Sequence, residues 1–100
     1  SIVQTLSQEH PNKLVEIMTT AINTVPFVGE YVVDALLAVF PNRAQTVVET
    51  AVRESVEQRE QVMKILSTAQ HAGVDNAKLK GYALAAGLSE DDFNSAITIR

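Results

Sequence analysis

Helical periodicity runs through every long segment of this 100-residue chain, and it constrains the fold more than any other feature. Apolar residues recur at steps of three and four, which places them on one face of an α-helix. No run alternates apolar and polar residues, and turn pairs such as Asn-Gly, which favour hairpins of strands, are missing. The pattern predicts an all-α fold, and the length predicts a single α-helical domain over residues 1–100.

Prolines and polar breaks divide the chain into helical segments. Pro11 suits the first turn of a helix, where its missing N–H costs nothing, and Pro41 ends the most apolar segment. Gly73 precedes two short segments that each begin with a capping residue, Asp75 and Ser89. The expected architecture is a compact bundle of five or six helices, over residues 2–8, from 11 to a break at 23–26, 26–40 and about 43–70, followed by a C-terminal pair.

The segment from about 43 to 70 is expected to form one long helix. At 1.5 Å per residue it would measure about 40 Å, whereas a compact domain of this size has a diameter of roughly 33 Å. Its apolar residues cover about half the circumference along the whole length. We therefore expect this helix to span the domain and to present part of its apolar face to another molecule.

Arg59 interrupts the apolar face of the predicted long helix, with Ser55 and Gln58 beside it. Glu30 and Asp34 form the narrow polar strip of the otherwise apolar segment 26–40. A buried guanidinium without a partner costs several kcal/mol, so burial would require a carboxylate nearby. We predict an ion pair between Arg59 and Glu30 or Asp34; the alternative is that Arg59 extends into water where the helix leaves the bundle.

Residues 79–97 have the spacing of a helix-turn-helix. A small residue (Ala83), a glycine four positions later (Gly87) and a buried turn residue (Leu88) stand where that motif needs them, with Phe93 and Ala96 facing the core. The residues that would read DNA are those near the start of the second helix and two lysines before it: Lys78, Lys80, Ser89, Asn94 and Ser95.

The charge of the same stretch opposes DNA binding. Glu90, Asp91 and Asp92 begin the second helix, where they suit the helix dipole but repel phosphate. The whole chain carries a net charge of −4 with an isoelectric point near 5.0. Nucleic acid is therefore not the expected partner.

Residues for catalysis or metal binding are sparse. The chain has no cysteine, no glycine-rich phosphate loop and no histidine spacing typical of zinc sites, and His10 and His71 lie next to predicted helix ends. Glu30 and Asp34 resemble an acid–base carboxylate pair in spacing, although a solvated strip explains them more simply. The sequence predicts a protein that is not an enzyme and that holds no metal or cofactor.

A membrane role is also not expected. The most apolar run, residues 25–40, contains Glu30 and Asp34 and is too short to span a bilayer. The first residues lack the basic and apolar regions of a secretory leader, which points to a cytoplasmic protein.

Function is predicted from these features together. A wide apolar face on a long helix, combined with little chemical apparatus, favours a protein–protein interaction or assembly module that self-associates through that helix. The alternative is a DNA-binding or transcription-regulating domain that uses residues 79–97.

Overall fold

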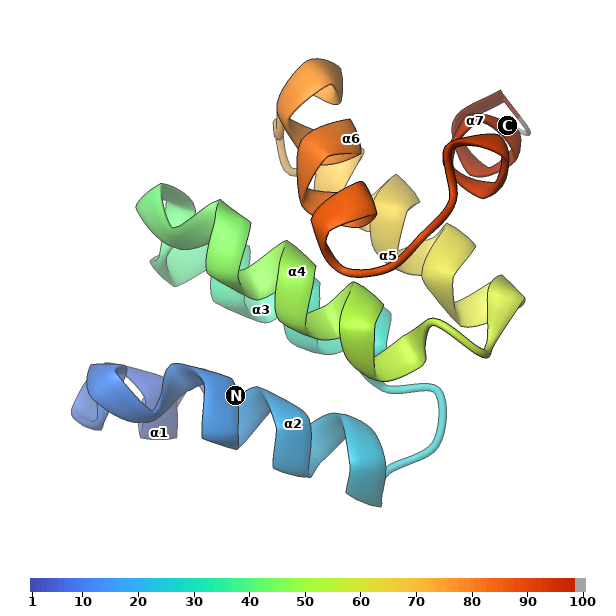
Figure 1. Ribbon diagram of the computed structural model, residues 1–100. Helices are drawn as coiled ribbons and strands as arrows, with labels where there is room; N and C mark the ends of the chain where they lie inside the picture. Colours follow the sequence, from blue (N-terminus) through green and yellow to red (C-terminus); the bar gives the residue numbers. More distant parts are fainter. Residues whose placement is uncertain (99–100) are drawn as a thin grey trace.

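The computed structural model describes residues 1–98, and these form helices joined by short turns, with no strand among them (Figure 1). Residues 99 and 100 of the predicted domain lie outside the described part. Within it the chain forms seven α-helices and two 3-10 turns: α1 Ile2–Glu9, η1 Pro11–Lys13, α2 Leu14–Thr24, α3 Gly29–Val39, η2 Pro41–Arg43, α4 Ala44–Ser55, α5 Arg59–His71, α6 Asn76–Ala85 and α7 Glu90–Thr98. The predicted all-α fold is confirmed, with more helices than the five or six expected.

The helices pair in chain order and the pairs stack. α1 and α2 form hairpin 1, α3 and α4 form hairpin 2, and α5 and α6 form hairpin 3 (Figure 1). In one layer α1 packs on α3, α3 on α5 and α5 on α7; in the other α2 packs on α4 and α4 on α6. Each hairpin thus contacts mainly its neighbours, as in proteins built from helical repeats.

Hairpins 1 and 2 share the same corner. The sequence Pro-Asn-Lys at 11–13 recurs as Pro-Asn-Arg at 41–43, thirty residues later. The residues before the two prolines have nearly equal backbone angles, with φ −133° and ψ 65° at His10 and φ −131° and ψ 59° at Phe40. Both prolines begin a 3-10 turn that leads directly into the next helix, so the two hairpins turn in the same way.

The long helix expected over about 43–70 does not exist as one element. α4 ends at Ser55 and α5 begins at Arg59, with a turn between them in which the Gln58 N–H donates to the Ser55 carbonyl at 2.8 Å. The break falls where Ser55, Gln58 and Arg59 interrupt the apolar face; Ser55 stays buried at the end of α4, whereas Gln58 and Arg59, which a straight helix would have placed toward the core, are exposed. The longest dimension is accordingly 37 Å, and none of the helices within residues 1–98 extends beyond the bundle as the single helix was expected to do.

The apolar faces of the two resulting helices are covered inside the molecule. Fully buried residues on α4 and α5 form the centre of the core: Val47, Val48, Ala51, Val52, Ile65, Leu66 and Ala69. The apolar surface that was expected to be free for self-association is therefore already used within the chain.

The third helix begins three residues later than predicted. Pro26, Phe27 and Val28 form a turn, and α3 starts at Gly29. Phe27 takes a positive φ of 56°, which is uncommon for a residue with a side chain, and that side chain is exposed.

The start of α3 is capped by a residue from α5. No side chain of its own turn caps this helix. Instead, the buried Gln61 places its side-chain amide at the helix start; with the amide oriented so that its oxygen faces the backbone, this oxygen accepts from the N–H groups of Gly29 at 3.0 Å and Glu30 at 3.1 Å. A buried amide is thereby satisfied, and hairpins 2 and 3 are joined at a fixed register.

Candidate functional site

The C-terminal helices α6 and α7 are joined by a tight turn at Gly87. Gly87 takes a φ of 106°, and the Leu88 N–H donates to the Ala83 carbonyl at 3.1 Å, which closes the turn. Ala83, Leu88 and Phe93 are buried, as is Ala96. The packing positions predicted from the sequence are confirmed.

Two of the five residues named as DNA readers, Lys80 and Ser89, are engaged within the pair. The Lys80 ammonium lies 2.6 Å from the Glu90 carboxylate, and this hydrogen bond and the attraction between the charges lower the pKa of Glu90 from its ordinary value of 4.5. Ser89 caps α7 by accepting from the Asp92 N–H at 3.1 Å. Glu90, Asp91 and Asp92 occupy the first turn of α7, so the surface offered to a phosphate is acidic.

The other three candidate readers are spread over different surroundings. Asn94 is exposed and Ser95 half-buried on α7. Lys78 lies on α6 beside Tyr82, facing a groove described below. The structure therefore does not gather Lys78, Lys80, Ser89, Asn94 and Ser95 into one basic surface.

Arg59 pairs with a different carboxylate from the one predicted. Its guanidinium lies 3.3 Å from the Asp92 carboxylate on α7, and 66% of its side chain is exposed. Glu30 and Asp34 lie near Thr68 and His71, toward the opposite end of α5. The predicted pair is corrected because the break before Arg59 moves it from a buried face to the first residue of a helix, next to the start of α7.

Glu30 and Asp34 line a shallow groove of about 310 Å³ between α3 and α5. Tyr31, Thr68, His71 and Ala72 complete it, and the His71 Nδ1 lies 2.8 Å from the Ser67 carbonyl oxygen. Within residues 1–98, no three histidine, aspartate or glutamate side chains come close enough together to hold a metal ion. None of the helices in that range has the length and apolar character needed to cross a membrane.

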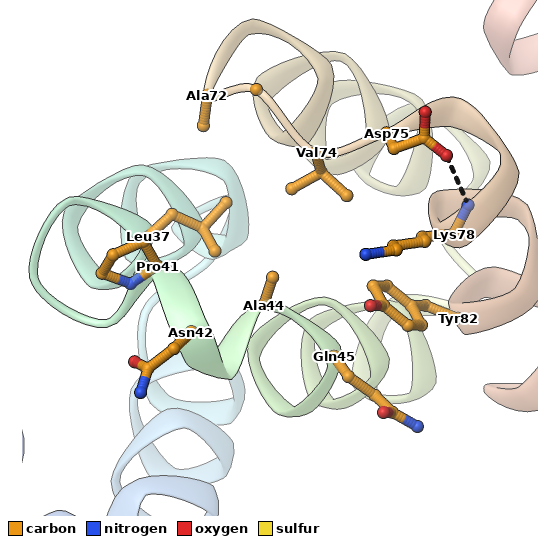
Figure 2. A pocket seen from close by; sticks show the side chains of 11 residues that line it. Leu37, Pro41, Asn42, Ala44, Gln45, Ala72, Val74, Asp75, Lys78 and Tyr82 are labelled. Atoms are coloured by element: carbon orange, nitrogen blue, oxygen red, sulfur yellow. Dashed lines mark hydrogen bonds between the residues drawn. The ribbon is translucent and has the colours of Figure 1, made fainter.

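A second groove, here called the corner groove, lies between η2 and the turn from α5 to α6 (Figure 2). It measures about 430 Å³, and its polar walls come from Asn42, Gln45, Lys78 and Tyr82. The Asp75 carboxylate at its edge is engaged in capping α6, where it accepts from the N–H groups of Ala77 and Lys78 at 3.1 and 3.3 Å. The Asp75 carboxylate therefore stabilises the start of α6.

A third groove runs along the outer face of hairpin 1, at the end of the stack, and is here called the end groove. It measures about 400 Å³ and combines apolar residues of α1 and α2 with a polar edge: Ile2, Val3, Leu6, Lys13, Glu16, Ile17, Thr20, Ala21, Thr24 and Val25. Ile2, Leu6 and Val25 are exposed although their side chains are large and apolar. Contiguous exposed apolar surface of this kind is typical of an interaction site.

The residues of hairpin 2 that lie thirty positions after those of the end groove form an equivalent surface, and this surface is largely buried. Ile2 is 78% exposed, and Val32, thirty residues later, is 2% exposed. Leu6 is 41% exposed, and its equivalent Leu36 is fully buried. The equivalents of Ile17, Thr20, Ala21 and Val25 are also buried: Val47, Thr50, Ala51 and Ser55.

Hydrogen bonds identify hairpin 1 as one of the elements that cover this face of hairpin 2. Arg43, the equivalent of Lys13, donates to the Pro11 carbonyl at 3.0 Å. Glu54, the equivalent of Thr24, accepts from the Asn23 side chain at 2.9 Å. The surface of hairpin 2 that matches the end groove is thus covered by hairpin 1.

Sequence reasoning missed the end groove because it treated each helix separately. The signal that reveals it is the recurrence of Pro-Asn-Lys as Pro-Asn-Arg, with similar apolar residues at the same offsets on both sides. No protein-family model matches the chain, and searches of curated proteins and of solved structures found no similar protein.

Proposed function

We propose that this protein is a non-enzymatic protein-interaction module that binds its partner through the end groove. The single observation that carries the proposal is the thirty-residue equivalence: a face that is buried by a helical hairpin in the middle of the stack is open at its end. In stacked helical architectures each unit buries its apolar residues against its neighbours and the end faces are ordinarily polar, so an apolar end face supports the presence of a partner.

The equivalence also supports a particular kind of partner. In hairpin 2 the same positions are covered by two helices, so a helical surface with apolar residues at steps of three and four suits the end groove. The apolar centre formed by Leu6, Ile17 and Ala21 would supply most of the binding energy. Lys13 and Glu16 at one edge would orient the partner.

Site-directed photo-crosslinking in the cell that makes the protein tests this proposal. A photoreactive residue at Leu6 is expected to give a discrete protein adduct, identified by mass spectrometry. The matched control places the residue at Leu84 on α6, which is 39% exposed against 41% for Leu6 and lies at the other end of the stack.

The specificity of the adduct is tested with a second change. Ile17→Glu puts a charge into the end groove and is expected to abolish the adduct at Leu6, while circular dichroism confirms that the variant remains helical. Absence of any adduct at Leu6, or equal labelling at Leu84, would count against the proposal.

DNA binding through α6 and α7 is the second candidate, and the tight turn at Gly87 is the observation in its favour. The acidic first turn of α7 and the Lys80–Glu90 pair weigh against it. Fluorescence anisotropy with labelled duplex DNA distinguishes the two: we expect no binding at physiological salt. Tight binding that is lost in Lys78→Glu and Lys80→Glu would reverse this order.

A further inference from the structure

We propose that the occupant of the end groove is a second copy of this chain, which contributes its own end groove about a two-fold axis. This inference rests on the proposed function, since it names the partner of the same surface. It differs from self-association through residues 43–70, whose apolar face is largely buried.

The distribution of exposed apolar residues carries the inference. Among the described residues, eight large apolar side chains are exposed, and three of them, Ile2, Leu6 and Val25, line the end groove; the other five are Val15, Phe27, Tyr31, Val56 and Leu84. A second copy can therefore match the end groove with apolar surface of similar extent if it offers the same end of its stack. An interface that uses one patch twice is isologous and closes at the dimer.

The alternative arrangement, in which one copy's end groove receives the other end of a second copy, pairs unlike surfaces. The other end is formed by α6 and α7 (Figure 1), where α7 begins with Glu90, Asp91 and Asp92. Burying carboxylates against Leu6 and Ile17 would remove them from water without a partner, which is unfavourable. Stacking of this second kind would also continue into filaments.

The charges at the end groove permit two copies to approach. The whole chain carries a net charge of −4, which by itself makes two copies repel. The end groove, however, is lined by one lysine and one glutamate, Lys13 and Glu16, so its own formal charge is zero. Contact through this face therefore adds little repulsion compared with contact through α7.

The size of the face sets the expected strength. α1 and α2 have 8 and 11 residues, which at 1.5 Å per residue gives helices of about 12 and 16 Å. Two adjacent helices of this length, each about 10 Å wide, present a face of roughly 300 Å², which is small compared with the roughly 800 Å² per partner that stable dimers bury. We expect association in the micromolar range.

Sedimentation equilibrium over a range of concentrations provides the first test. The mass is expected to rise from monomer to dimer as the concentration increases through the micromolar range, and to stop there. Leu6→Glu is expected to weaken the dimer at least tenfold, whereas the matched Leu84→Glu leaves it unchanged. Circular dichroism checks that both variants are folded. If Leu6→Glu is not folded, Thr20→Glu replaces it, because Thr20 is exposed in the middle of the groove.

Introduced cysteines test the symmetry. The natural chain has no cysteine, so any disulfide comes from the introduced residue. Glu16, Thr20 and Thr24 lie one turn apart along the groove face of α2 and are replaced by cysteine one at a time. Near a two-fold axis a residue meets its own copy, so at least one of the three is expected to form a disulfide-linked dimer under mild oxidation, and Ala77→Cys on α6 is not.

Three results would overturn the inference: a monomer mass up to high micromolar concentration, a mass that grows beyond the dimer, or a dimer that Leu6→Glu does not weaken. These outcomes separate it from the proposed function. A monomer whose Leu6 photo-crosslinks to a different protein retains the proposed function and loses the second copy, whereas a monomer without any adduct loses both.

Discussion

Single residues show how closely neighbouring hairpins depend on one another, and Gln61 is the clearest case. Its buried amide supplies the cap that the start of α3 lacks, and it can do so because position 29 is a glycine. A Cβ at Gly29 would lie 2.5 Å from the Gln61 amide and 3.0 Å from the Cδ1 atom of Ile65. The absence of a side chain at residue 29 thus allows a side chain thirty-two residues later to reach the helix end.

Gly29→Ala is expected to lower the free energy of unfolding by about 1–3 kcal/mol, because the added methyl group displaces Gln61 from the helix start. Gly81→Ala is the matched control, since a Cβ there meets nothing within 4 Å and the residue lies inside α6. That change is expected to raise the free energy of unfolding by about 0.5–1 kcal/mol. Urea denaturation measures both, and equal effects of the two substitutions would contradict this account of Gly29.

The Lys80–Glu90 pair predicts a local dependence on pH. Its hydrogen bond and charge attraction lower the pKa of Glu90 below 4.5 in the folded state. The pair therefore stabilises the fold above pH 4.5, and its contribution is lost as the pH falls through the lowered pKa. Titration of the Glu90 carboxyl by nuclear magnetic resonance should show the lowered pKa in the natural chain and a return toward 4.5 in Lys80→Met; an unchanged pKa in that variant would refute the assignment.

The helices were predicted correctly where hydrophobic periodicity alone determines their positions, and incorrectly where packing against neighbouring helices determines where they end. The helical class, the two proline corners and the Gly87 turn follow from local sequence, and the structure has all three. The break between α4 and α5 contains neither glycine nor proline, so no local rule placed it. The polar residues Ser55, Gln58 and Arg59 on the apolar face indicated the break. We interpreted Arg59 as one member of an ion pair, whereas it is the first residue of a new helix.

The candidate site was out of reach of the sequence for a similar reason. Which apolar side chains of a helix are covered depends on whether another hairpin lies against them, and Leu6 and Leu36 look alike in sequence. Their different exposure follows from position in the stack, which becomes visible when the two corners are recognised as equivalent.

The substitutions Leu36→Ala and Leu6→Ala measure this difference in burial between equivalent positions of two helices. Leu36 is fully buried between elements, so its truncation is expected to lower the free energy of unfolding by about 2–5 kcal/mol. Leu6 is 41% exposed, and its truncation in the monomer is expected to cost less than about 1 kcal/mol. Chemical denaturation at a concentration that keeps the chain monomeric measures both, and similar losses would argue against treating the two positions as the open and covered forms of one site.

The whole molecule is a stack of helical hairpins with two ends, so we expect the local stability to decrease from the middle of the stack toward the ends. α4 packs against α2, α3, α5 and α6, whereas α1 and α7 each contact elements on one side of the stack. In stacked architectures the outer units open with less free energy than the inner ones. Amide hydrogen exchange is expected to be slowest in α4 and fastest in α1 and α7, and uniform protection across the helices would show that the chain opens only as one unit.

The corner shared by Pro11 and Pro41 has a consequence for how a chain of this design changes length. Because the two corners are thirty residues apart and turn alike, an in-frame tandem duplication of such a segment adds one further hairpin whose two faces already match those of its neighbours. A duplication of this kind leaves the existing side chains in their positions, and the end groove is then formed by the outermost hairpin. Insertions of a few residues within a helix, by contrast, would turn the apolar residues that follow them in that helix away from the core, so we expect gene variants of different length to differ by whole hairpins or within the turns.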